Sequence, residues 1–101
     1  MPQSRSVPPD DGRYHSPHVQ PRPDCERLRW EALWPGAKSA RVRSYTCSCR
    51  PTFYELCQSG GTVFIRRTRR IRGEEVIDES SRGRPAKVEA VWRKLMTGEV
   101  A

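Results

Sequence analysis

The sequence predicts a small α+β domain made of a strand, a short helix, a β-hairpin and a C-terminal amphipathic helix, preceded by a disordered proline-rich arm. Three observations lead to this fold class. The chain has 101 residues, enough for one small domain. Apolar and polar residues alternate in its central part, as they do in half-buried strands. Close to the C-terminus, the apolar residues instead recur at the spacing of an amphipathic helix.

The first third of the chain divides into two predicted segments. Residues 1–23 contain six prolines and almost no large apolar side chain, so this arm is expected to be disordered. A short helix is predicted over residues 24–36, between a Pro-Asp start and a Pro-Gly stop. One face of this helix carries Trp30, Leu33 and Trp34. That face either covers a core that is short of apolar area or docks on a partner protein through its tryptophans.

Residues 38–101 are predicted to form the folded domain. The alternation in "ARVRSYTCSC", residues 40–49, predicts a strand. A short helix is expected to open at Pro51 or Thr52 and to end at Gly60-Gly61. Three apolar side chains would share a face of this helix, namely Phe53, Leu56 and Cys57.

The rest of the domain is predicted as a hairpin and a helix. "TVFIRRTRR" and "EEVIDES" read as two antiparallel strands, with Gly73 supplying the permissive backbone of the turn between them. "PAKVEAVWRKLMTG" predicts the final helix, with Gly98 after its end. The apolar stripe of this helix consists of Val88, Val91, Trp92, Leu95 and Met96.

The net charge of +7 comes from residues 38–101, which carry 14 basic residues against seven acids. A basic folded domain presents a positive surface, so an anionic partner is expected, with nucleic acid favoured and DNA ahead of RNA. Of the 19 basic residues, 16 are arginines, whose planar groups match phosphate geometry. Codon bias in a GC-rich genome would explain arginine over lysine, but it would not explain the clustering.

The densest cluster lies in the predicted hairpin. From Arg66 to Arg70 both faces of the strand carry arginine, and burial of unpaired charge is too costly, so the hairpin is expected to project as a charged arm. The residues expected to contact phosphate are Arg66, Arg67, Arg69, Arg70 and Arg72. The alternative is a solvated hairpin that neutralises itself through Glu74, Glu75, Asp78 and Glu79.

"RGRP", residues 82–85, resembles the Arg-Gly-Arg-Pro core of an AT-hook. The resemblance implies that Arg82 and Arg84 insert into a narrow A·T minor groove. The flanking "DESS" lacks the basic residues usual there. The alternative is a plain helix start with Pro85 at its first position, where Arg84 and Lys87 would sit beside amides that suit a phosphate.

Four cysteines raise the question of a metal. Cys47, Cys49 and Cys57 lie within eleven residues, with Cys25 further away, and His15 and His18 could complete a zinc site. The C-x-C spacing is not a standard zinc knuckle. The alternative places Cys57 in the core and the C-x-C pair on one strand face. Cys49, next to Arg50, is the best candidate for a reactive thiol, and a disulfide within the C-x-C pair has poor geometry.

The remaining signals bear on the class of protein. The sequence has no Gly-rich phosphate loop, no H-E-x-x-H and no G-x-S-x-G, and its two histidines lie in the predicted arm, so an enzyme is not expected. It has no apolar run of transmembrane length and no secretory signal, so a cytoplasmic location with reduced thiols and no membrane partner is expected.

Three function classes follow from these residues. The leading hypothesis is a DNA-binding accessory or regulatory protein without a cofactor. The alternatives are an adaptor that docks through Trp30 and Trp34, and a small zinc or thiol protein that uses Cys47, Cys49 and Cys57. A dimer would raise affinity in the leading hypothesis, although no residue indicates one.

Overall fold

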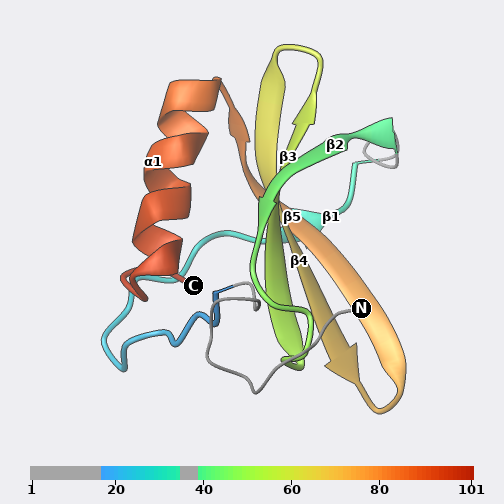
Figure 1. The fold of residues 1–101 in the computed structure, drawn as a ribbon, viewed down its shortest axis with the longest axis vertical. Helices are drawn as coiled ribbons and strands as arrows, with labels where there is room; N and C mark the ends of the chain where they lie inside the picture. Colours follow the sequence, from blue (N-terminus) through green and yellow to red (C-terminus); the bar gives the residue numbers. More distant parts are fainter. Residues whose placement is uncertain (1–16, 35–38) are drawn as a thin grey trace, which may run out of the picture.

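The chain folds into one antiparallel sheet backed by a helix, and the computed structural model describes residues 17–34 and 39–101 (Figure 1). The sheet has the strand order β1-β5-β4-β3-β2. The α+β class predicted from the sequence is therefore confirmed. In chain order the elements are β1 (Glu31–Ala32), β2 (Arg41–Tyr45), β3 (Thr52–Ser59), β4 (Thr62–Ile71), β5 (Glu74–Gly83) and α1 (Pro85–Met96).

The predicted hairpin is confirmed as β4 and β5, which pair from Val63 with Gly83 down to Ile71 with Glu74. Both central residues of its turn have positive φ, +52° at Arg72 and +82° at Gly73. Such turns match the right-handed twist of the two strands. The turn lies at the opposite end of the sheet from the start of α1 (Figure 1).

The short helix predicted from Pro51 or Thr52 is wrong, because the segment forms β3. Tyr54 and Leu56 point toward α1 and belong to the main core, whereas Cys57 belongs to a second cluster with Phe64. This is period-2 alternation, so Leu56 and Cys57 lie on opposite faces rather than on one. The segment contains residues that favour strands, and it pairs with β4 along its whole length, from Thr52 with Arg69 to Ser59 with Thr62.

The helix predicted over residues 24–36 is also wrong across its described part, 24–34, which is extended apart from a turn at its start. We call residues 17–34 the strap. Its backbone pairs with the C-terminus of the chain: the Arg22 amide donates to Gly98, and a parallel bridge joins Glu26 to Val100. Ten residues form only a marginal helix alone, so these hydrogen bonds decide the conformation. Residues 17–23, expected to belong to the arm, thus lie against the domain, while residues 1–16 lie outside the described residues.

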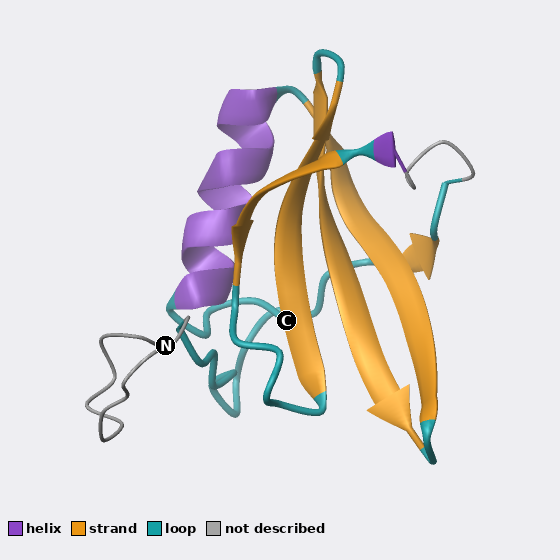
Figure 2. Ribbon diagram, turned by 45° about the vertical axis from the view of Figure 1, so that its right-hand side comes forward, coloured by secondary structure: helices purple, strands orange, loops and turns teal. Residues whose placement is uncertain are grey.

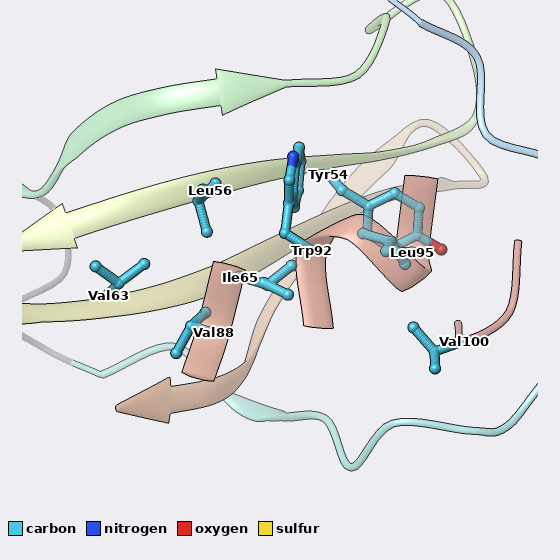
Figure 3. Close-up of a cluster of buried hydrophobic side chains, with 8 residues drawn as sticks. All are labelled: Tyr54, Leu56, Val63, Ile65, Val88, Trp92, Leu95 and Val100. Carbon is cyan, nitrogen blue, oxygen red and sulfur yellow. The ribbon is translucent and has the colours of Figure 1, made fainter. Parts of the chain in front are cut away.

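The main core lies between the sheet and α1, on the face that the helix covers (Figure 2). Eight buried side chains form it, and Figure 3 shows them between β3, β4, α1 and the C-terminus. The strap adds Val19, Leu28 and Trp30 at its border. A smaller cluster on the opposite face joins Cys57 and Phe64, with Leu33 and Ala40 packed against them. The core residues are Tyr54, Leu56, Val63, Ile65, Val88, Trp92, Leu95 and Val100.

The C-terminal helix is confirmed as α1, with Pro85 in its first turn and Val88, Trp92 and Leu95 buried. Gly98 follows its end with φ +80°, the left-handed conformation expected at this position. No helix among the described residues is long and apolar enough to cross a membrane.

Candidate functional site

The arginines of β4 lie on both faces of the sheet, and three of them are half-buried and ion-paired. Nε of Arg66 donates to Glu55 on β3 at 2.8 Å. Arg67 and Arg69 share Oδ2 of Asp78 on β5, at 2.7 and 3.0 Å. The expectation of a freely projecting arm is therefore wrong for these three residues. Each of the three has an acidic partner on a neighbouring strand, but Arg67 and Arg69 share one carboxylate, so this pair of arginines keeps an excess of positive charge.

Only the tip of the hairpin, residues 70–77, is exposed along its whole length. Arg70 makes a long ion pair with Glu75, at 3.6 Å, and also donates to the carbonyl of Ser48 in the β2–β3 loop at 2.7 Å. Its backbone amide donates to Pro51. Arg50 stands in that loop between these two contacts with Arg70, and Arg50, Arg70 and the turn residue Arg72 are all exposed.

Arg82 is held in place by a carboxylate and two aromatic rings. It donates to both oxygens of Glu79, at 2.6 and 2.7 Å. Its guanidinium carbon lies 4.2 Å from the ring centroid of Phe64 and 4.8 Å from that of Trp34. Burial acts to raise the pKa of Glu79, but the hydrogen bonds from Arg82 and from the Trp34 amide outweigh it and lower that pKa.

The "RGRP" segment is a helix start, as the alternative interpretation held. Arg82 and Gly83 end β5, Arg84 is the N-cap residue of α1, and Pro85 stands at the beginning of the helix. Arg84 and Lys87 are exposed. Because Arg82 is committed to Glu79, the exposed cations of this segment are Arg84 and Lys87, at the far end of the sheet from the hairpin turn.

The three apolar residues of the strap are placed separately. Trp30 packs against the main core, with its ring centroid 5.9 Å from that of Tyr54 and the guanidinium of Arg67 at 4.3 Å. Leu33 packs against the second cluster. Trp34 is 49% exposed. The core-covering interpretation thus describes Trp30 and Leu33, and partner docking by Trp34 stays a prediction.

A cationic pocket of about 530 Å³ lies between the strap and the sheet. Arg22 and Arg27 line it from the strap, and Arg67 and Arg69 line it from β4. No acidic side chain is among its lining residues. Nε of Arg67 and Nε of Arg69 are buried and have no hydrogen-bond acceptor in the described part of the chain. The arrangement suits an anion that accepts hydrogen bonds from planar guanidinium groups.

Tyr54 also lines this pocket. Burial raises the pKa of its hydroxyl, which therefore stays protonated at neutral pH and remains able to donate a hydrogen bond. The sequence does not predict this pocket, because Arg22 lies in the segment expected to be disordered and Arg27 in the segment expected to be helical. Their local sequence, "PRPDCER", gives no signal that they meet Arg67 and Arg69.

The cysteines separate into three environments. Cys57 is fully buried beside Phe64, and burial raises its pKa to about 11, so it is a core residue as the alternative interpretation held. Cys25 lines the cationic pocket. The same alternative interpretation is wrong for Cys47 and Cys49, which lie in the loop between β2 and β3 and not on a strand face. They lie together with His18 of the strap, whereas His15 lies outside the described residues. The strap brings His18 to the C-x-C pair, a proximity that spacing along the chain does not reveal.

Comparisons with known proteins add no relative: no family model, no curated protein and no solved structure matches this chain. The residues and their geometry are therefore the basis for assigning a function.

Proposed function

We propose that this domain binds nucleic acid, with DNA as the favoured partner, by contacting phosphates at the hairpin end of the sheet. The observation that carries the proposal is the pocket lined by Arg22, Arg27, Arg67 and Arg69 without an acidic side chain. Four guanidinium groups around one opening favour an anion with several acceptor oxygens. A backbone phosphate has this chemistry.

The pocket combines two fixed and two exposed cations. Asp78 orients Arg67 and Arg69 through hydrogen bonds to one oxygen, so these groups lose little freedom when an anion arrives. Arg22 and Arg27 belong to exposed residues of the strap. Asp78 and the α-carboxylate of Ala101, which also lines the pocket, offset part of the charge of the four guanidinium groups and leave an excess of positive charge there.

Further exposed cations lie near the hairpin turn, with Arg70 over the Phe53 ring on the sheet face opposite the pocket. Arg50, Arg70 and Arg72 lie on adjacent segments that are hydrogen-bonded to each other. If about five phosphates are engaged, the slope of log K against log salt is about −4.5, and binding weakens roughly 500-fold between 50 and 200 mM salt. Arg66 and Arg82 are not expected to contact phosphate, because they are paired with Glu55 and Glu79.

The test measures fluorescence anisotropy with A·T-rich duplex, G·C-rich duplex and single-stranded RNA across a salt series, with heparin as a charge control. The double variant Arg22→Gln/Arg27→Gln removes the exposed half of the pocket. Its matched control, Arg84→Gln/Lys87→Gln, removes the same charge at the opposite end of the sheet. We expect the pocket variant to weaken duplex binding about tenfold more than the control does.

Two results would overturn the proposal. Equal losses in both double variants would mean that net charge alone attracts nucleic acid, and an affinity that does not change with salt would exclude phosphate contacts. Preference for the RNA would keep the phosphate pocket and correct the partner. Circular dichroism of each variant checks that the fold is retained.

A protein partner is the second candidate, carried by the exposed indole of Trp34 beside Arg82. Exposed tryptophan and arginine are enriched among residues that dominate binding energy at protein interfaces. Trp34→Ala separates the two proposals, because it removes the anchor of an adaptor and leaves the cationic pocket intact. The variant should bind DNA as the wild type does, and loss of DNA binding at retained fold would favour a site around Trp34.

A further inference from the structure

The strap and the β2–β3 loop bring one imidazole and two thiols into a single group. Nε2 of His18 lies 3.1 Å from Sγ of Cys49, and Sγ of Cys47 lies 3.0 Å from Sγ of Cys49. All three donor atoms lie within 4.8 Å of one another. We propose that His18, Cys47 and Cys49 bind one Zn²⁺ ion.

The donor set fits zinc in type and in spacing. Thiolate sulfur and imidazole nitrogen are the ligands that zinc prefers, at about 2.3 and 2.0–2.1 Å. A tetrahedral ion with these bond lengths needs its donors about 3.5–3.8 Å apart. The present separations reach these values through small side-chain rotations. The three residues leave the fourth position to water or to an outside ligand, as in zinc sites with three protein ligands.

The loop that carries the two thiols is held by hydrogen bonds on both sides. Thr46 is buried, its amide donates to the carbonyl of Tyr54, and its hydroxyl oxygen accepts from the Tyr54 amide. Arg70 donates to the carbonyl of Ser48, the residue between the two cysteines. The thiols therefore stand on a constrained turn rather than on a free loop, which reduces the entropy lost when a metal binds.

The strap is anchored to the domain at the residues on either side of His18. The carbonyl of Pro17 accepts a hydrogen bond from the Cys47 amide at 2.8 Å, and Val19 packs against the main core. These two anchors place His18 beside the C-x-C pair. His18 and Cys49 are 31 positions apart in the sequence, yet their side chains are in contact. A turn whose side chains only faced solvent would not require this contact.

Both thiols must lose their protons when the ion binds. Arg50 follows Cys49 directly, and Arg70 donates to the Ser48 carbonyl in the same loop. The ion itself drives the deprotonation, because a thiol that coordinates Zn²⁺ is deprotonated outright. On binding, the two thiols release their protons to solvent, and each sulfur and the imidazole Nε2 donate an electron pair to the ion.

The zinc site goes beyond the proposed nucleic-acid function and does not depend on it. The metal would tie the strap to the β2–β3 loop and so fix the segment that carries Arg22 and Arg27. Zinc affinity is measured without nucleic acid, so failure of one proposal leaves the other intact.

The test uses the full chain, reduced with a phosphine, stripped of metal with a chelator and titrated with Zn²⁺ against a chromogenic zinc indicator. Co²⁺ serves as a spectroscopic probe, because tetrahedral Co²⁺ with two thiolates gives strong visible d–d bands and sulfur charge transfer. The ligand variants are His18→Ala, Cys47→Ser and Cys49→Ser. Cys25→Ser is the matched control, since Cys25 is outside the group.

We expect one equivalent of Zn²⁺ to bind the wild type and Cys25→Ser equally well, with a higher thermal midpoint in both. Each ligand variant should bind at least about 100-fold more weakly, because even outer-shell partners are worth roughly 10–100-fold. These residues lie outside both core clusters, and circular dichroism verifies the fold of each variant. Equal zinc affinity in wild type and Cys47→Ser would overturn the proposal. So would a Cys47–Cys49 disulfide that persists in the phosphine and excludes zinc.

Discussion

The guanidinium of Arg82 donates to both carboxylate oxygens of Glu79. The same guanidinium lies over the indole ring of Trp34, and the backbone amide of Trp34 donates to the same carboxylate. Glu79 is only 6% exposed. A charge this deep is stable only because it is paired and hydrogen-bonded. The pair therefore connects β5 to the strap, and an arginine that could have been counted as a free cation serves the fold.

Removing the charge of Glu79 should destabilise the domain. We expect Glu79→Gln to lower the free energy of unfolding at pH 7 by about 1.5–3 kcal/mol, the usual value of hydrogen bonds to charged groups. The exposed pair of Arg70 and Glu75 supplies the control, and Glu75→Gln should cost at most about 0.5 kcal/mol. Urea denaturation measures both variants, and equal costs would contradict the assigned role of Glu79.

The effect of Glu79 should also depend on pH. Its folded pKa is lowered from the ordinary value of 4.5, so its stabilisation is complete above pH 4.5 and is lost as the pH falls through the lower folded value. The difference in unfolding free energy between wild type and Glu79→Gln should therefore be constant between about pH 6 and 8 and should shrink below pH 4.5. A difference that is the same at pH 3 and pH 7 would contradict this assignment.

Asp78 should contribute more to stability than one surface ion pair does, because it is the ion-pair partner of both Arg67 and Arg69. Asp78→Asn leaves two half-buried guanidinium groups without an anion and should cost about 3–5 kcal/mol. Added inorganic phosphate should then raise the thermal midpoint of the variant more than that of the wild type, because the cationic pocket has gained an unsatisfied site. A phosphate response equal in the two proteins would argue against an anion site at Arg67 and Arg69.

The sequence predicts the elements whose pattern is local. The stripe from Val88 to Met96 covers about two and a half turns and specifies α1. The alternation around a permissive Gly73 specifies the hairpin. The short apolar run in "TFYELCQS" fits both the 3.6-residue period of a helix and the two-residue period of a strand. Its pairing with β4 over its whole length makes it a strand, β3. A run of that length carries no internal sign of the partner strand that will select its conformation.

The candidate site is harder to predict because its residues meet through the strap. The Arg22 amide donates to the Gly98 carbonyl after α1, and the Cys47 amide donates to the carbonyl of Pro17, which precedes His18. These contacts use the main chain, which leaves no side-chain pattern in the sequence. The ion pairs of Arg66, Arg67 and Arg69 likewise depend on strand register. Whether these arginines form a charged arm or are paired within the sheet is decided by the acids opposite them on the neighbouring strands.

Docking of the strap should be sensitive to Gly98. Its φ is +80°, and a Cβ at this position would collide with the backbone carbonyl oxygen of Gln20. Gly98→Ala should therefore cost at least about 1–2 kcal/mol from the left-handed backbone alone. It should also speed hydrogen exchange at the amides of Arg22 and Cys47, which donate to Gly98 and Pro17. Gly61→Ala is the control, since a Cβ there meets nothing within 4 Å. Unchanged exchange at both amides would mean that the strap does not depend on this close approach.

Cys57 and Cys49 should differ sharply in reactivity toward alkylating agents. Burial raises the pKa of Cys57 to about 11, so at pH 8 only about one thiol in a thousand is ionised, and the side chain is also inaccessible. A hydrogen bond with Cys47 raises the pKa of Cys49 as well, but Cys49 is exposed, so the reagent reaches it. In the native protein with chelator present, iodoacetamide should modify Cys49 well before Cys57, as read by peptide mass spectrometry. In urea all four cysteines should react at similar rates, which is the internal control for reagent access. Modification of Cys57 as fast as Cys49 in the native protein would place Cys57 outside the core and would exclude the packing of β3 against Phe64.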